Sequence, residues 1–352
     1  MTKGYRMRQI ELGQSGLMVS EWCLGTMTYG NQTGQDDAHR QIDMALDAGI
    51  DFIDTAEMYP VNPVRLETVG RSEEIIGNWI ARTGRRSGIT LATKVAGPGS
   101  VARDGRGYDG RVIREAVDAS LRRLQTDVID LYQLHWSARG GYNFRQNWTY
   151  DPSRQNREAT LAHMDDVLGA LADLVSAGKL RSFGLSNETC WGTTRWIDRA
   201  AVLGAPRVAS VQNEYSLLCR FYDTDMAEMA VNEKVTLLAF SPLAAGFLTG
   251  KYQDGAVPAD SRMALVPDLG GRKSERVFGA VAAYLRVAAQ FGLDPVHMAM
   301  AWQRTRPFSV CPIFGATSAE QLARILAGRD LVLAPEVVTA LNDTHKAFPM
   351  PF

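Results

Sequence analysis

The sequence predicts an α/β protein, a (β/α)8 TIM barrel, on three observations. Short apolar segments alternate with longer amphipathic segments from near residue 20 to near residue 330, which is typical of repeated βα units. There are eight such apolar segments, and their β-branched or apolar residues suit strands buried on both faces. The sequence LGTMTYG follows the first segment in place of G-x-G-x-x-G, so an open nucleotide-binding sheet is disfavoured and a closed barrel is favoured.

The barrel elements can be placed by length and periodicity. The expected strands are residues 22–26, 52–54, 90–94, 128–134, 182–185, 208–211, 235–240 and 309–313. The expected helices are residues 37–48, 72–81, 112–124, 160–177, 193–203, 225–231, 274–291 and 319–326. Local signals support several boundaries: Asp36 or Asp37 opens the first helix, Gly49 closes it, and Gly178 closes the fourth.

The remaining segments are expected to decorate the barrel. Residues 8–19 alternate polar and apolar side chains and predict an N-terminal β-hairpin plug at the bottom of the barrel, while residues 334–347 predict an extra C-terminal helix. Three long irregular segments follow the second, fourth and seventh strands and are expected at the mouth, where the strands end: residues 60–71, 136–157 and 252–273. No shift in composition marks a boundary, so residues 1–352 are interpreted as a single domain.

The composition excludes several classes of protein. Lys and Arg number 38 against 39 Asp and Glu, so no long-range positive field favours nucleic acid or an anionic membrane. No stretch approaches the roughly 20 apolar residues of a membrane span, and the N-terminus has no apolar signal core. These features predict a cytoplasmic protein. The four cysteines and five histidines follow no metal-binding motif, so no metal is expected.

Polar residues of unusual type lie at or just beyond the carboxyl ends of predicted strands. They are Asp54 in FIDTAEMY with Tyr59 five residues on, Lys94 in LATKV, and His135 in LYQLHW. Alone, each has an ordinary explanation as a turn former, a rim aromatic, a solvated strand end or a core histidine. Strand ends of a barrel converge on one mouth, however, and an apolar strand that carries a lysine there requires a partner or a function. Together the four residues predict one site.

These residue types fit the reduction of a carbonyl group by hydride transfer. Negative charge develops on the carbonyl oxygen, and a positioned acid must supply a proton. A phenol has an ordinary pKa near ~10, and we expect the ammonium of Lys94 to lower the pKa of Tyr59 towards neutrality. Asp54 would hold the lysine, and His135 would place the carbonyl oxygen against the tyrosine hydroxyl.

Seven motifs in order carry a resemblance to a known family: GIDFIDTAEMYP, LATKV, DLYQLHW, FGLSNE, SVQNEYSLL, AFSPLAAGFLTGKY and FGATSAEQL. Over essentially the whole chain the sequence resembles the aldo-keto reductase superfamily. The segments LGTMTYG, LRRLQTDVIDLYQLHW and GLSNET are most similar to its bacterial Tas-type branch. The resemblance implies a catalytic tetrad with Tyr59 as general acid and base. It also implies NADP(H) bound in extended form across the mouth without a Rossmann fold.

The resemblance also implies which residues contact the cofactor, expected to be NADPH. Around the nicotinamide these are Thr26, Met27, Gln32, Asp54, Ser186, Asn187, Gln212 and Phe240, with Phe240 stacking on the ring. Along the pyrophosphate and adenosine they are Ser241, Pro242, Leu243, Ala244, Gly246, Lys251, Arg262, Gly315, Thr317, Gln321 and Arg324. Arg324 stands where relatives often carry glutamate, so it either pairs with the 2′-phosphate or points to solvent. Lys251 and Arg262, taken alone, would be read as solvated loop residues.

The sequence therefore predicts NADPH-dependent reduction of aldehydes and ketones, with a small-molecule carbonyl substrate. The alternative is a cofactor-binding regulatory protein of the same fold, like the potassium-channel β-subunits of this superfamily; the intact tetrad and the absence of a long N-terminal arm favour an enzyme. An apolar mouth without a carboxylate clamp predicts a preference for apolar over charged substrates. The residues expected to line it are Tyr29, Met58, Trp136, Tyr142, Phe144, Trp148 and Phe247.

Overall fold

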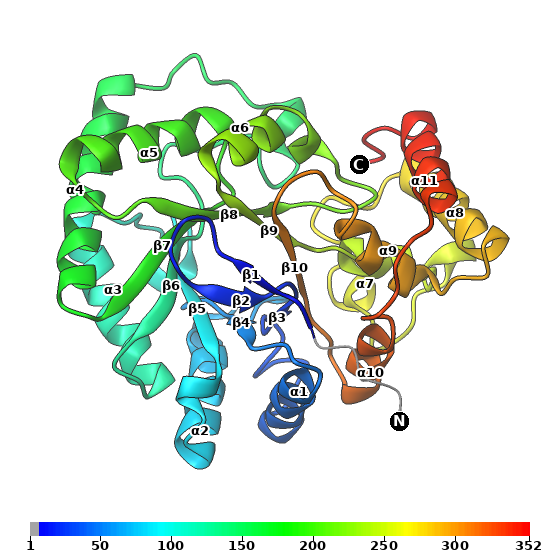
Figure 1. Cartoon of the computed structure of the whole chain (residues 1–352), viewed down its shortest axis with the longest axis horizontal. Helices are drawn as coiled ribbons and strands as arrows, with labels where there is room; N and C mark the ends of the chain where they lie inside the picture. Colours follow the sequence, from blue (N-terminus) through cyan, green and yellow to red (C-terminus); the bar gives the residue numbers. More distant parts are fainter. Residues whose placement is uncertain (1–6) are drawn as a thin grey trace.

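The computed structural model describes residues 7–352 and contains a closed barrel of eight parallel strands surrounded by helices (Figure 1). The strands of the barrel are β3 (Cys23–Gly25), β4 (Phe52–Asp54), β5 (Thr90–Val95), β6 (Ile129–Leu134), β7 (Leu180–Ser186), β8 (Val208–Glu214), β9 (Thr236–Phe240) and β10 (Val310–Phe314). Neighbours in sequence are neighbours in the barrel, and β10 pairs with β3 to close it. The predicted (β/α)8 TIM barrel is confirmed.

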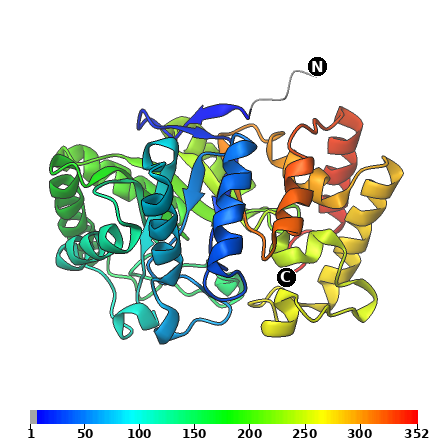
Figure 2. The same ribbon diagram turned by 90° about the horizontal axis from the view of Figure 1, so that it is seen from below.

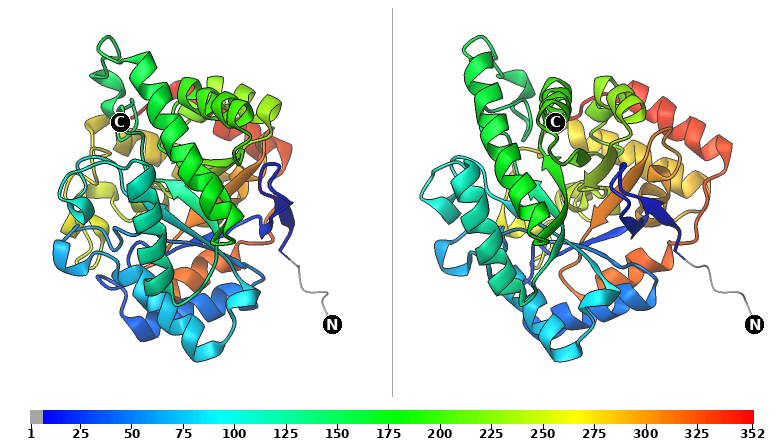
Figure 3. Two further views of the ribbon diagram at one scale, coloured as in Figure 1. Left: turned by 90° about the vertical axis from the view of Figure 1, so that its left-hand side faces the viewer. Right: turned by 60° about the vertical axis from the view of Figure 1, so that its left-hand side comes forward.

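The helices lie on the outside of the barrel, and several that follow each other in sequence pack side by side, as α3 and α4 do in Figure 3. In the described part of the chain they are α1 (Gln35–Asp47), α2 (Arg71–Thr83), α3 (Gly110–Leu124), α4 (Arg157–Ser176), α5 (Cys190–Leu203), α6 (Asp225–Glu233), α7 (Arg262–Leu265), α8 (Glu275–Gln290), α9 (Pro295–Gln303), α10 (Ala319–Ala327) and α11 (Pro335–Ala347). The predicted C-terminal helix at 334–347 corresponds to α11.

The predicted N-terminal hairpin closes one end of the barrel. It consists of β1 (Gln9–Glu11) and β2 (Met18–Ser20), paired antiparallel. Leu12 and Val19 are fully buried against side chains inside the barrel. Gly13 lies so close to β8 that a Cβ atom there would be 2.4 Å from the carbonyl oxygen of Ala209, which explains the glycine. Figure 2 shows the hairpin at the end opposite to the long loops.

The segment between β9 and β10 differs from the single helix expected at 274–291. Helix α8 occupies this stretch, but α9 follows it, and α9 is the helix that packs against β10, while α8 packs against α9 and α11. The side chains of α9 are buried on almost every side, so its sequence has no apolar stripe to announce a helix. The missed signal was local: Asp294 caps the first turn and Pro295 occupies its first position.

Candidate active site

Asp54 and Lys94 form the buried floor of the barrel mouth. Asp54 ends β4 and is paired with Ala92 of β5, so that Lys94, two residues on, faces the same side. The Nζ atom of Lys94 lies 2.6 Å from Oδ2 of Asp54 and 2.7 Å from the carbonyl oxygen of Thr55. Lys94 has no exposed surface. A charge buried to this degree needs such partners, because otherwise its desolvation would favour the neutral form.

Tyr59 and His135 lie above this pair. The hydroxyl of Tyr59 is 3.4 Å from Nζ of Lys94, and its ring meets the ring of His135 edge to face with centroids 5.7 Å apart. Together with Asp54 these residues form the predicted cluster of four side chains. The floor and the two rings place a proton donor, a cation and an imidazole within a few ångströms of one another.

The pKa of Tyr59 differs from the expectation. Burial raises it above the ordinary value of 10.0, and the nearby ammonium of Lys94 opposes this rise without overcoming it. The expectation that Lys94 brings the pKa of the phenol towards neutrality is therefore wrong, because desolvation outweighs the charge. Burial, and then the charge of Lys94, hold the pKa of His135 well below 6.5, so its imidazole is neutral at neutral pH.

A cleft of about 530 Å³ opens above the four residues. The predicted residues that line it are Thr26, Met27, Asp54, Tyr59, His135, Ser186, Asn187, Gln212, Phe240, Ser241, Pro242, Leu243, Gly246, Lys251, Arg262, Gly315, Thr317, Gln321 and Arg324. Lys94 lies beneath this lining. Gln32 and Ala244 are outside it: the amide of Gln32 donates to the carbonyl of Asn62 at 2.6 Å, and Ala244 is buried in the core.

Comparison with known proteins assigns the chain to a family. A sequence model described as the aldo/keto reductase family matches residues 21–346. The chain belongs to the aldo/keto reductase family. It is 41% identical to Protein tas of Escherichia coli K12 over 98% of this chain and 99% of that protein. It is 33% identical to the uncharacterized oxidoreductase YrpG of Bacillus subtilis over 98% of this chain and 97% of that protein. It is 30% identical to a probable voltage-gated potassium channel subunit beta of Arabidopsis thaliana over 97% of this chain and 98% of that protein.

Family membership supports an oxidoreductase that acts on carbonyl compounds, the coarse form of the predicted function. No helix within residues 7–352 is long and apolar enough to cross a membrane. In the same residues no group of three or more His, Cys, Asp or Glu side chains is arranged to hold a metal ion.

Two glutamines that hold Asp54 complete the floor of the candidate site. Gln133 donates from Nε2 to Oδ1 of Asp54 at 2.9 Å, and Gln212 donates to the same oxygen at 3.0 Å. Sequence reasoning assigned Gln212 to the cofactor and missed Gln133. The available signal was a polar amide inside a largely apolar strand, two residues before His135, which directly follows β6.

A second buried ion pair fixes the loop between Asp54 and Tyr59. Glu57 accepts hydrogen bonds from Nε and Nη2 of Arg103 at 2.9 and 2.6 Å, and from the backbone N–H of Ala96 at 2.7 Å. Burial raises the pKa of Glu57, which these three bonds oppose. Sequence reasoning also missed this pair, because no spacing rule links residues 57 and 103.

The three cations expected near the cofactor have different surroundings. Arg262 is partly buried, its Nη2 lies 3.7 Å from the sulfur of Met27, and it has no acidic partner among residues 7–352. Burial and the charge of Arg272 lower the pKa of Arg262 to about 10. Arg324 borders the cleft but is paired with Asp294 at 2.9 Å, so it is neither free in solvent nor an unpaired charge. Lys251 lies over the ring of Tyr252.

The mouth is less apolar than expected. Of the predicted aromatic and apolar residues, Met58, Trp136 and Phe144 line the cleft. Tyr29 and Phe247 belong to the core, Trp148 is 64% exposed, and Tyr142 lines a smaller neighbouring pocket. Two arginines that sequence reasoning did not identify, Arg145 and Arg272, also line the cleft. Both arginines are paired with Glu214, and the expected preference for apolar over charged substrates stays a prediction.

Proposed function

We propose that the protein reduces aldehydes and ketones to alcohols with NADPH, and that Tyr59 is the general acid. One observation carries this proposal: the hydroxyl of Tyr59 faces a large cleft while a fully buried ammonium, held by Asp54, lies 3.4 Å behind it. This arrangement is suited to an acid whose conjugate base must be stabilised. Family membership supports the same class of reaction.

The residues can perform the reduction in one concerted step. NADPH, held by the residues that line the cleft, would supply a hydride with its electron pair to the carbonyl carbon. As negative charge develops on the carbonyl oxygen, Tyr59 donates its hydroxyl proton to that oxygen, giving the alcohol and a tyrosinate. Lys94 stabilises the tyrosinate by charge, and Asp54 keeps Lys94 protonated and in place. Neutral His135 can donate a hydrogen bond to the same carbonyl oxygen and so orient it.

The lining of the cleft fits a dinucleotide. The Oδ1 atom of Asn187 is buried without a hydrogen-bond partner among residues 7–352, so it can accept from the amide of a nicotinamide carboxamide. Phe240 offers a ring for stacking beside it. Arg262 supplies a positive charge without an acidic partner for the pyrophosphate, and Lys251 and Arg324 border the cleft for the 2′-phosphate. These features support NADPH in particular.

A second candidate is a cofactor-binding regulatory protein of the same fold. It is favoured by the similarity to a protein named as a probable voltage-gated potassium channel subunit beta. The two candidates differ in turnover. Purified protein is incubated with NADPH and a panel of aldehydes and ketones, and NADPH oxidation is followed by absorbance alongside product analysis. If the protein is an enzyme, one molecule of alcohol should form for each molecule of NADPH oxidised. Tight NADPH binding without product from any carbonyl compound would favour the regulatory candidate.

A further inference from the structure

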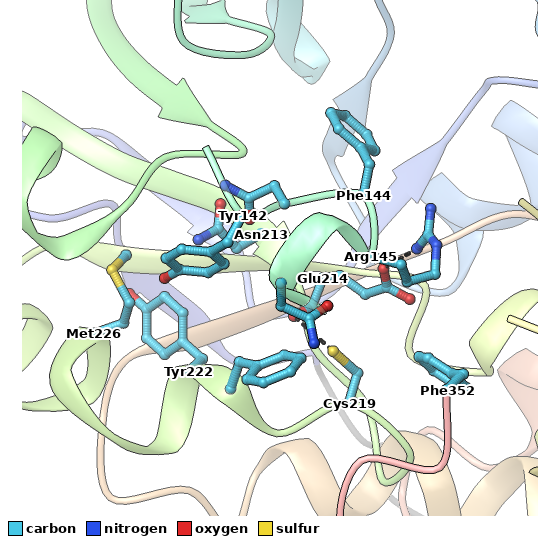
Figure 4. Close-up of a pocket in the computed structure, with 12 residues that line it drawn as sticks. Tyr142, Phe144, Arg145, Asn213, Glu214, Cys219, Tyr222, Met226 and Phe352 are labelled. Carbon is cyan, nitrogen blue, oxygen red and sulfur yellow. Dashed lines mark hydrogen bonds and ion pairs between the residues drawn. The ribbon is translucent and has the colours of Figure 1, made fainter. Parts of the chain in front are cut away.

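A cluster of three charged side chains joins two mouth loops to the barrel. Glu214, the last residue of β8, accepts from Nη1 of Arg145 at 2.6 Å and from Nε of Arg272 at 2.7 Å. Arg145 comes from the loop before α4, and Arg272 comes from the loop before α8. Figure 4 shows the guanidinium of Arg145 turned to the carboxylate of Glu214. All three side chains are at most 15% exposed.

The cluster carries an excess of positive charge. Two guanidinium groups share one carboxylate, so the three groups sum to one uncompensated positive charge. The Nε atom of Arg145 is buried without a hydrogen-bond partner in the described chain, residues 7–352. Burial and the charge of Arg272 lower the pKa of Arg145. A buried cation that is short of partners is stabilised by an anion that supplies them.

The cluster faces the catalytic cleft. Arg145 and Arg272 line the same cavity as Tyr59 and His135. An aromatic wall connects the two ends: the rings of His135 and Trp136 have centroids 5.0 Å apart, and those of Trp136 and Phe144 are 6.2 Å apart. Phe144 directly precedes Arg145 in sequence. A bound molecule could therefore place a reactive group at Tyr59, an apolar body along the wall and an anionic group at the arginines.

We propose that Arg145 and Arg272 form a specificity subsite for the carboxylate of a carbonyl substrate, so that the preferred substrates are aldehyde or ketone acids with an apolar spacer. The proposal rests on the proposed reductase function. One excess positive charge matches a monoanionic carboxylate better than a phosphate dianion, and planar guanidinium groups suit a carboxylate in geometry. Arg262 lies beside Met27 and has no acidic partner in the described residues, so we assign it to the cofactor.

The wild-type enzyme gives the first test, with 4-carboxybenzaldehyde and methyl 4-formylbenzoate as substrates. These probes have similar shape, but only the first is an anion, and the ester is the more electrophilic aldehyde, so intrinsic reactivity does not favour the acid. With NADPH saturating, kcat/KM for the acid is expected to exceed that for the ester by about tenfold or more, the effect of one charge-assisted hydrogen bond. Equal values, or a preference for the ester, would overturn the proposal without affecting the proposed reductase function.

Variants assign the effect to the arginines. Arg145→Met and Arg272→Met each leave Glu214 paired with the other arginine, and each is expected to lower the acid-to-ester ratio of kcat/KM about tenfold. Arg111→Met is the matched control: Arg111 is exposed and paired with Glu115 on α3, so the ratio should not change. If both cluster variants instead weaken NADPH binding and leave the ratio intact, the arginines serve the cofactor and the proposal is wrong.

Binding separates failure of this proposal from failure of the proposed function. Calorimetry with NADP+ present measures the affinity of the two aldehydes without hydride transfer. If the acid binds more tightly than the ester and Arg145→Met removes this difference, the subsite is supported, even where neither aldehyde is reduced. Failure to reduce them would refute only the reductase function for these substrates. Equal binding of both probes would overturn the subsite.

Discussion

Lys94 contacts Tyr59 at two points: its Nζ atom is 3.4 Å from the hydroxyl oxygen and 4.7 Å from the ring centroid. The ammonium is therefore placed both against the oxygen that becomes charged and over the electron-rich face of the ring. Because burial still keeps the pKa of Tyr59 raised, the phenol is protonated before the reaction. In the proposed mechanism, Lys94 therefore contributes most after Tyr59 has given up its proton.

The first prediction concerns Tyr59→Phe, which removes the proton donor and little of the binding surface. We expect kcat to fall by about 10²-fold or more, the range of general acid catalysis, with the dissociation constant of NADPH nearly unchanged. Stopped-flow measurement of NADPH oxidation and fluorescence titration check the two parts. Tyr150→Phe, outside the cleft, is the control. Turnover near the wild-type rate in Tyr59→Phe would remove Tyr59 from the mechanism.

The fold and the four central side chains could be predicted because their signals are local. The barrel follows from alternating periodicity, and Asp54, Lys94 and His135 are polar residues at the ends of apolar strands. The position of the strand ends then follows from the topology alone. Helix α9 could not be found by periodicity, because a helix buried on nearly all sides has no polar face.

The contacts that could not be predicted join distant loops. Glu214 holds Arg145 and Arg272, which lie 69 and 58 residues away. Nothing in the spacing of these residues indicates that they meet. Desolvation was also underestimated: the charge of Lys94 was visible in the sequence, but the burial that outweighs it at Tyr59 depends on how the loops pack.

The second prediction concerns Lys94→Met, which leaves Asp54 buried without its cation. We expect activity to fall because the tyrosinate loses its stabilising charge. We also expect the free energy of unfolding to fall by about 3 kcal/mol, since an uncompensated charge remains in the core. Chemical denaturation and turnover of the folded fraction separate the two effects. Wild-type kinetics in this variant would require a different source of stabilisation for Tyr59.

The third prediction concerns the pH dependence of aldehyde reduction. The pKa of His135 is lowered well below 6.5 and that of Tyr59 is raised above 10.0, so neither changes protonation near neutrality. At saturating NADPH, kcat/KM should be flat from about pH 6.5 to about pH 9, and it should fall as the pH rises through the pKa of Tyr59. A tenfold decline between about pH 6.5 and about pH 8 would contradict the assignment of these protonation states.

The fourth prediction separates the cations along the cofactor. Arg262 contacts Met27, and its charge acts on Tyr59, so it lies at the part of the cleft that both cofactors would share. Arg262→Met should therefore weaken the binding of NADPH and of NADH in parallel. Each lost charge-assisted hydrogen bond, of about 1.5–3 kcal/mol, should lower the affinity by about tenfold or more. Arg324→Ala and Lys251→Ala should weaken NADPH selectively.

Fluorescence titration of both cofactors against each variant makes the comparison. Equal affinity of the wild type for NADPH and NADH would refute the expected preference. Arg324 is already paired with Asp294, so its contribution should be smaller than that of a cation without an acidic partner. Asp294→Asn releases the arginine and should strengthen NADPH binding. A loss of NADPH affinity in Asp294→Asn would instead show that Arg324 depends on this carboxylate for its position.

The last prediction concerns the ion pair between Glu57 and Arg103, which holds the loop carrying Tyr59. Arg103→Met leaves Glu57, 5% exposed, without its bidentate partner, and we expect the free energy of unfolding to fall by about 3 kcal/mol near neutral pH. The loop should also lose its fixed position, so kcat should fall more than the affinity for NADPH. Arg106→Met is the control, because Arg106 is 74% exposed and lies 3.9 Å from its partner Asp104.

The destabilisation should depend on pH with a definite sign. Burial raises the pKa of Glu57 in the folded protein, and Arg103 is the main group that opposes the rise. Without Arg103 the folded-state pKa rises further above its unfolded value, so the folded protein binds the proton more readily. The stability conferred by that proton is present at acid pH and is lost as the pH rises through the folded-state pKa.

Chemical denaturation at about pH 5 and about pH 8 measures this effect. The difference in free energy of unfolding between variant and wild type should be smaller at the lower pH. A difference that is equal at both values would mean that Glu57 remains ionised without Arg103, held by the N–H of Ala96 alone.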